Sequence, residues 1–254
     1  MRTKFFTCLL AAGALLASVP TSAQDVQTIL SKVAAVYQNA KSYQAQASLT
    51  ETRQMGGQRQ KRTSTISTKY KAPNKIVTIV QGSDSLQVYS DGKTMYLYSP
   101  KDKEYMKMPA PASFAQQAGM SGIGSGDPSQ IGAQLQAIFG MDGKKLPDRN
   151  VGGKPVFVLQ STRSGQSQDG TSSFSVKATA FIDKATYTLR QITLEASQSQ
   201  GTQKVAQTIN FTVLSQQINP NLPDSVFAFR PPAGAKERKA QEMPGRTGGP
   251  GAPR

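Results

Sequence analysis

The sequence lacks several residue types on which common catalytic and metal sites depend. Its 254 residues include no histidine, no tryptophan and a single cysteine. Without histidine there is no Ser-His-Asp triad, no Cys-His pair and no histidine-containing zinc or iron site. With one cysteine there is no intramolecular disulfide and no Cys-x-x-Cys redox pair. We therefore expect a protein that is not an enzyme and that carries no cofactor and no metal.

Two weaker candidates for chemistry remain. The glycine-rich stretch 122–126 lacks the spacing of a phosphate-binding loop, and Asp127 follows it where a phosphate would lie. Five carboxylates lie in or near predicted strands: Glu51, Asp84, Glu104, Asp183 and Glu195. Nothing in their spacing marks the carboxylate pair that glycoside hydrolysis needs. An enzyme therefore ranks below a binding protein among the hypotheses.

The N-terminal segment has the pattern of a secretory signal. A charged start precedes an apolar run from Phe5 to Val19, and small residues follow up to Ala23. The run is shorter than the roughly 20 residues that a membrane span needs. Cys8 lies before most of the run and has no small residue in front of it, so we do not expect it to carry a lipid. The pattern predicts a signal peptide over 1–23 and a soluble periplasmic protein.

The chain is strongly basic, with 30 Lys and Arg against 15 Asp and Glu. For an exported protein, this charge favours transient contact with anionic membrane or an envelope protein rather than with nucleic acid. The cations are dispersed, so a charge that only confers solubility is an equally good interpretation. We expect a monomer.

The hydrophobic pattern changes from a helical period to a strand period early in the chain. Between Asp25 and Ala40, apolar residues recur every three or four positions and predict an amphipathic helix. Beyond Ser42 the period approaches two, and Asp91-Gly92 has the composition of a hairpin turn. The predicted strands are 43–54, 61–71, 75–81, 85–90, 93–98 and 104–108.

An insert over 109–145 is predicted to be flexible because it is rich in Gly, Ala, Pro and Gln. Within it, Asp127-Pro128 predicts the start of a short helix that Gly140 could end. Strands resume at 154–163, 173–183, 187–197 and 203–214, with a last short strand over Val226–Arg230. Residues 236–254 are predicted to be a disordered basic tail, since they hold too little apolar surface to order.

These elements predict an α+β fold over 24–235. About ten or eleven strands with short connections favour a single curved antiparallel sheet, an unclosed β-barrel, whose concave side is covered by helices. A sheet of this strand number curls, and helices in its mouth enclose a concave apolar space. Apolar and methionine side chains gather in or beside the insert, and such a surface suits ligands of variable form such as acyl chains. Alternatively, these side chains simply plug one end of the core.

Four motifs resemble a known family of exported proteins. They are the helical start Asp25–Leu30, the stretch Lys71-Ala72-Pro73-Asn74, the hairpin Ser90-Asp91-Gly92-Lys93 and the closing sequence 227–234, Phe-Ala-Phe-Arg-Pro-Pro-Ala-Gly. In order and span they resemble the periplasmic outer-membrane lipoprotein carriers of the LolA superfamily, which includes LolA-, LolB- and RseB-like folds. The longer insert and the basic tail depart from the pattern, so we expect a divergent member.

The resemblance implies an unclosed β-barrel whose hollow holds the acyl chains of a lipoprotein under a helical lid, with no cofactor and no catalysis. In carriers of the family, the residue immediately before the proline is an arginine, and this arginine holds the lid shut. In this chain that residue is Ala72. Lys71 is the nearest cation and is the candidate for a cation at the lid or mouth.

We predict a carrier that shelters lipid chains and passes them towards the outer membrane. The alternative is a lipid-responsive sensor, RseB-like, that acts through a protein partner. The predicted lining of the hollow is Ile76 by analogy, and Val80, Leu97, Met106 and Met108 by alternation. The predicted inner surface of the lid is Phe114, Ile131, Leu135 and Ile138.

Overall fold

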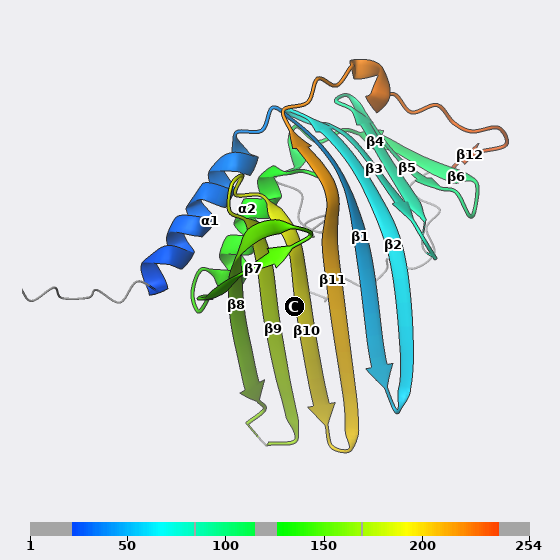
Figure 1. Cartoon of the computed structure of the whole chain (residues 1–254). Coiled ribbons are helices and arrows are strands. Elements are labelled where there is room, and N and C mark those ends of the chain that lie inside the picture. The colour runs from blue at the N-terminus through cyan, green and yellow to red at the C-terminus, as the bar shows by residue number, and fades with distance from the viewer. Residues whose placement is uncertain (1–21, 84, 115–125, 169, 239–254) are drawn as a thin grey trace, which may run out of the picture.

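The computed structural model describes residues 22–83, 85–114, 126–168 and 170–238. Its strands form one twelve-stranded sheet in the order β12-β6-β5-β4-β3-β2-β1-β11-β10-β9-β8-β7. All neighbours pair antiparallel except β12 and β6, which run parallel. Because β12 and β7 remain at opposite edges, the sheet is curved but not closed, as Figure 1 shows.

The described chain contains two α-helices, a 3-10 helix and these strands. The helical segments are α1 (Ser22–Gln38), α2 (Ser129–Phe139) and η2 (Asp224–Phe227). The strands are β1 (Ser42–Met55), β2 (Gln58–Lys71), β3 (Lys75–Gln81), β4 (Leu86–Asp91), β5 (Thr94–Ser99), β6 (Glu104–Pro109), β7 (Lys144–Val151), β8 (Lys154–Gln166), β9 (Ser172–Asp183), β10 (Leu189–Gln200), β11 (Gln203–Ile218) and β12 (Lys236–Glu237).

The predicted α+β class, the curved antiparallel sheet and both helices are confirmed. The predicted signal peptide lies almost wholly outside the described residues. Strand β7 was not predicted, because Lys144–Val151 contains a proline and five charged or amide side chains and lacks a clear alternation. Such a composition suits the edge of a sheet, where a neighbouring chain must be kept from pairing.

Two predictions near the C-terminus are wrong. The predicted strand Val226–Arg230 is the end of a 3-10 helix followed by irregular chain. The predicted tail begins too early, because Lys236 and Glu237 pair with Glu104 and Tyr105 as β12. Arg238 continues this attachment by an ion pair with Glu104 at 3.1 Å. Backbone pairing with an edge strand can therefore order a segment that has little apolar surface of its own.

The main core lies between the helices and one face of the sheet. The apolar stripe of α1, which includes Leu30, Val33 and Tyr37, packs against Leu135 and Phe139 of α2 and against side chains of β1, β9 and β10. The Tyr37 hydroxyl accepts from the Leu189 amide at 2.9 Å and donates to Gln216 Oε1 at 3.0 Å. Burial raises the pKa of Tyr37, so the hydroxyl stays protonated in this bridge between α1 and the sheet.

The opposite face of β3–β6 is covered by residues 219–238, here called the C-terminal strap. Leu222 and Phe227 of the strap pack on Val77. The ring of Phe229 lies among four tyrosine rings at centroid distances of 4.8–6.0 Å, those of Tyr89, Tyr96, Tyr98 and Tyr105. Figure 1 shows the strap crossing from β11 to the far edge of the sheet.

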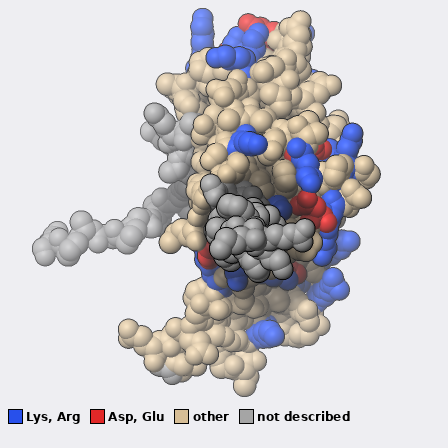
Figure 2. All heavy atoms as spheres, turned by 60° about the vertical axis from the view of Figure 1, so that its left-hand side comes forward, with Lys and Arg blue, Asp and Glu red and all other residues tan. Residues whose placement is uncertain are grey.

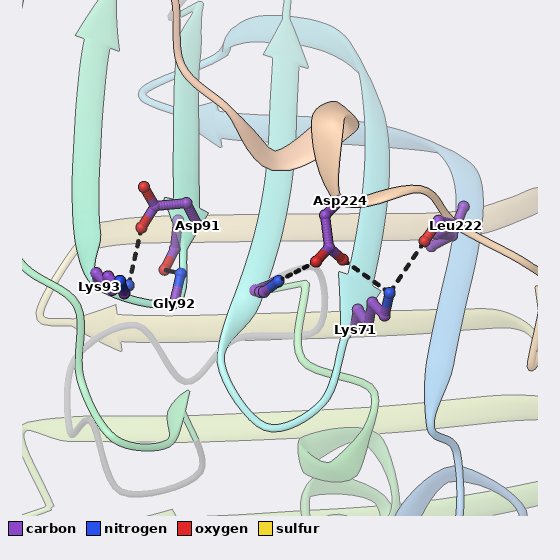
Figure 3. Close-up of polar contacts among 8 residues, drawn as sticks. Lys71, Asp91, Gly92, Lys93, Leu222 and Asp224 are labelled. Carbon is purple, nitrogen blue, oxygen red and sulfur yellow. Dashed lines mark hydrogen bonds and ion pairs between the residues drawn. The ribbon is translucent and has the colours of Figure 1, made fainter.

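Besides Arg238, Asp224 joins the strap to the sheet, through two ion pairs. The Asp224 carboxylate accepts from Lys71 Nζ and from Lys75 Nζ, each at 2.7 Å, and Lys71 also donates to the Leu222 carbonyl at 3.2 Å (Figure 3). The hydrogen bonds from the two lysines lower the pKa of Asp224 to about 2. Lys71 therefore binds the strap, on the face of the sheet that the helices do not cover.

The Asp224 ion pairs predict a pH dependence of stability. Because the folded-state pKa lies below the unfolded value of about 3.9, the pairs stabilise the fold above pH 4 and this contribution is lost as the pH falls to about 2. We expect Asp224→Asn to lower the melting temperature at neutral pH and to match the wild type near pH 2. Thermal unfolding followed by circular dichroism over this range checks it, and a constant difference between the two proteins would contradict it.

Candidate functional site

The sheet has two faces of different character, and strand register assigns residues to each. We call the face that carries α1 and α2 the inner face and the other the outer face. Ala45 and Ala47 of β1, Ile66 of β2 and Phe211 of β11 belong to the inner face. The register from β2 to β6 adds Ile76 and Val80 of β3, Leu97 of β5, and Met106 and Met108 of β6 to the same face.

One end of the inner face is closed by α2 and the residues before it. Gly126 lies so close to β3 that a Cβ there would be 2.4 Å from Thr78 Oγ1 and 2.6 Å from Ile76 Cδ1. Its φ of +94° also favours glycine. Asp127 is buried, and its carboxylate accepts from the amide and the hydroxyl of Ser129 at 2.9 and 2.8 Å. Asp127 thus orders the start of α2, and Gly126 lets the segment before the helix approach β3 closely.

The space under this cover is nearly filled. A cavity of about 30 Å³ remains, lined by α1, by residues 126–131 and by the inner face. A site of this size holds a water molecule or two and is too small for an acyl chain. Burial, with a smaller effect of the Asp127 charge, raises the pKa of Tyr70 beside it to about 12. The predicted open hollow is therefore occupied at this end by the protein's own side chains.

Beyond the helices no described element covers the inner face, and on β9–β11 this face carries several apolar side chains. Leu194 and Ile209 are partly buried, while Phe174 and Val176 are 50% and 39% exposed. The outer face at the same level of the strands is polar and charged, with the in-register row Thr52, Thr208, Glu195, Lys177 and Thr162. At this level of the strands, exposed apolar side chains lie on the inner face and not on the outer one, which marks a candidate binding surface.

A polar groove of about 160 Å³ adjoins this apolar region on β1 and β2. It is lined by Glu51, Arg53, Gln60, Arg62 and Gln207. These residues are in register with the apolar row, since Glu51 pairs with Ile209 and Arg53 with Gln207. The uncovered part of the inner face is therefore amphipathic across the strands, with apolar groups on β9–β11 and charged groups on β1 and β2.

The predicted site residues fall into two groups. Phe114 packs with Ile76, Val88 and Met95 in a small cluster on β3–β5, and Leu97 and Met108 border it. Leu135 is fully buried in the main core, and Ile131, Ile138 and Val80 pack against that core. Phe114 and α2 thus cover different parts of the inner face. Lipid binding by any of these residues stays a prediction.

The sequence analysis assigned no role to three side chains that stabilise or destabilise the packing of α2. Phe139 is fully buried with Leu135. Gln134 buries both polar atoms of its amide without a hydrogen-bond partner among the described residues. Arg163, at the inner face of β8, donates to the carbonyls of Ala137 and Ile138 at 3.3 and 3.2 Å and pairs with Asp142 at 3.0 Å.

Arg163 acts as a capping cation for α2, because a helix C-terminus carries unpaired carbonyls and partial negative charge. The hydrogen bonds from Arg163 and Ser161 hold the pKa of Asp142 below its usual value. No pattern in the sequence singles out this arginine, which stands in a polar strand. Among the described contacts, the cation that binds α2 is therefore Arg163 of β8, whereas Lys71 binds the strap.

Comparisons with known proteins find one family model and several solved structures to which the chain is similar. Residues 26–119, less than half of the chain, match the model of a family described as predicted periplasmic protein, DUF2092. No curated protein matches the sequence. Among solved structures, the chain is similar to LprF from Mycobacterium bovis, with 11% identity and a TM-score of 0.42 over 79% of this chain and 96% of that one.

Two further solved structures are similar. One is a LolA superfamily protein from Nitrosomonas europaea, with 12% identity and a TM-score of 0.31 over 80% of this chain and 97% of that one. The other is a putative outer membrane lipoprotein-sorting protein domain from Vibrio parahaemolyticus, with 10% identity and a TM-score of 0.30 over 81% and 97%. LolA superfamily proteins are among its structural neighbours. At these scores they are too distant to locate a ligand in this chain.

The described residues contain neither a candidate metal site nor a membrane-spanning helix. Across 22–83, 85–114, 126–168 and 170–238, no group of three or more Cys, Asp or Glu residues could hold a metal ion. Within the same part of the chain, no helix has the length and apolar composition needed to cross a membrane.

The Arg163 contacts predict a local effect on α2. Arg163→Gln removes the ion pair and the donors to the helix C-terminus, so we expect amide hydrogens of Ser129–Phe139 to exchange roughly two- to fivefold faster. Hydrogen exchange followed by mass spectrometry measures this, with β1 and β11 as an internal reference. Arg59→Gln, at an exposed strand end, serves as the control, and equal exchange in both variants would contradict the assigned role.

The unpaired amide of Gln134 predicts a stabilising substitution. A buried polar group without a partner costs free energy, so Gln134→Leu should raise the free energy of unfolding by about 1 kcal/mol. Urea denaturation checks the value. Gln136→Leu on the same helix removes an exposed side chain that donates to Gln27 at 3.1 Å and should give no increase. A loss of stability in the Gln134 variant would show that its amide has a partner in solution.

Proposed function

We propose that this protein is a periplasmic carrier that shelters acyl chains of a lipid or lipoprotein on its inner face and passes them on towards the outer membrane. One observation carries the proposal: apolar side chains run along the inner face past the helices, where they are exposed, while the outer face at the same level is polar. The description of the matching family as periplasmic supports the location.

An acyl chain gains roughly 0.8 kcal/mol for each methylene group that leaves water. Leu194, Ile209, Val176 and Phe174 offer a surface on which such a chain can lie without moving any part of the described fold. Entry of the acyl chain under the helices requires movement of the protein, since the cavity there has a volume of only about 30 Å³. A chain that goes further in must displace Ile131 and the residues before it.

This arrangement favours moderate affinity, which a carrier needs in order to release its cargo. Lipid contacts under α2 replace contacts that the protein already makes with itself, so the net gain per buried group falls. The anchors of α2 act at its two ends: Gly126 and Asp127 at the start, Arg163 at the finish. Their strength sets how far the cargo enters.

Exposed inner-face residues test the proposal without disturbing the core. The double variant Phe174→Ser and Val176→Ser should bind a fluorescent long-chain fatty acid at least roughly tenfold more weakly than the wild type, because both side chains lose contact with the chain. Leu214→Ser is the matched control: Leu214 is 56% exposed and apolar, and it lies on the outer face. It should bind as the wild type does.

Native mass spectrometry of the purified proteins gives the second measurement. The wild type and the Leu214 variant should retain lipid, and the double variant should retain less. Equal binding by all three proteins, or no bound lipid and no binding of the fatty acid by the wild type, would refute the carrier proposal.

A further inference from the structure

The hairpin formed by β7 and β8 presents cations that lack an acidic partner. Lys144, Arg149 and Lys154 are exposed, and no described carboxylate lies within ion-pair distance of any of them. Strand register places all three on the outer face of the hairpin, since Lys154 pairs with Val151, Arg149 with Val156 and Lys144, at the far end, with Gln160. The outer face of the hairpin therefore keeps a local positive charge.

Three more lysines surround two aromatic rings on the inner face of this hairpin, opposite the first three cations. The rings of Phe157 and Tyr187 lie 5.7 Å apart. Lys184 and Lys145 stand over Phe157 at 5.1 and 6.0 Å, and Lys32 of α1 stands over Tyr187 at 4.8 Å. Asp148 pairs with both Lys145 and Lys184 and offsets only part of their charge.

An exposed methionine completes the surface. Met141 is 93% exposed in the turn between α2 and β7, directly before the lysines of β7. The turn is fixed by backbone hydrogen bonds from Gly140 to Gln136 and from Gly143 to Phe139 at 2.8 and 2.9 Å. Asp142 beside it is already bound by Arg163 and Ser161. A single exposed apolar side chain is ordinary, but here it projects from an ordered turn bordered by cations.

Because β7 is an edge strand, cations of both faces meet at this edge of the sheet. We propose that this edge, made of Met141, the β7–β8 hairpin and the lysines around Phe157 and Tyr187, docks the protein edge-on on anionic phospholipid bilayers. The cations bind lipid phosphates, and Met141 enters the headgroup region. In Figure 2, the side of the molecule that carries α1 and α2 bears Lys and Arg at its middle and top, and few charges towards the ends of the long strands.

Charge and chemistry favour a bilayer over a soluble acidic protein. A membrane offers a continuous sheet of negative charge to cations spread over two strands and a helix, together with an apolar layer for Met141. Aromatic rings capped by lysines are also typical of protein surfaces that meet the membrane interface. The surface adjoins the end of α2, and the inference does not depend on whether the inner face carries acyl chains.

The test compares two charge-matched variants of the full chain. The first is Lys144→Gln, Arg149→Gln and Lys154→Gln; the control is Lys101→Gln, Lys103→Gln and Lys107→Gln, three exposed lysines on β6 and the turn before it. Binding is measured by co-sedimentation with vesicles containing phosphatidylglycerol and with vesicles of phosphatidylcholine alone. Because Cys8 is the one cysteine in the sequence, replacing it permits a single dye at an introduced cysteine as a second readout.

The wild type and the control should bind the anionic vesicles and not the neutral ones. The hairpin variant should bind about 100-fold more weakly, as expected for three cations near the surface, and rising salt should weaken the wild type. Met141→Ser should weaken binding at high salt, where the apolar contact dominates.

Equal losses in the hairpin variant and the control would overturn the proposal, because total charge would then explain the binding. Equal binding to neutral vesicles would overturn it as well. So would the absence of vesicle binding together with capture by an acidic soluble protein, which would assign the surface to a protein partner. Since none of these outcomes depends on fatty-acid binding, the two proposals fail separately.

Discussion

A sheet of twelve strands has two faces to cover, and in the described chain only two α-helices and one strap are available to cover them. The helices close one end of the inner face, and the strap closes the outer face of β3–β6. The rest of the outer face needs no cover because threonine, serine and charged side chains make it soluble. The rest of the inner face is not covered by described residues and is apolar on β9–β11, and this imbalance is what gives the fold a candidate binding surface.

The cover over the inner face combines close packing with polar anchors at its ends. Gly126 permits an approach to β3 that any side chain would prevent, and Gly132 does the same where α2 meets Ala34 of α1. Arg163 and Asp127 fix the ends of the helix through hydrogen bonds that a few ångströms of movement would break. The middle of α2, by contrast, is held by apolar contacts that another apolar partner could replace.

The sequence was sufficient to predict the sheet, both helices and the face to which Val80 and Leu97 belong, because alternation and helical period report burial directly. Ile76 was assigned to that face by resemblance to the family. The sequence did not predict β7, whose edge position demands a polar composition that also describes a loop. Nor did it predict the strap, because Phe229 is buried by tyrosines from three other strands and nothing local distinguishes it from a strand residue. The partners of Arg163 and Lys71 depend on contacts across the fold, which the sequence near each residue does not contain.

The order of strands in the sheet differs from their order in the chain at two places, and both concern the C-terminal residues. Strand β1 needs β11 as its second neighbour, and β6 needs β12. If the chain crosses a membrane from its N-terminus, its first strands reach the far side long before the residues that complete their pairing. Strands β1 and β6 can then complete their pairing only after almost the whole polypeptide has been delivered. Until then, the early hairpins stay available to chaperones during passage.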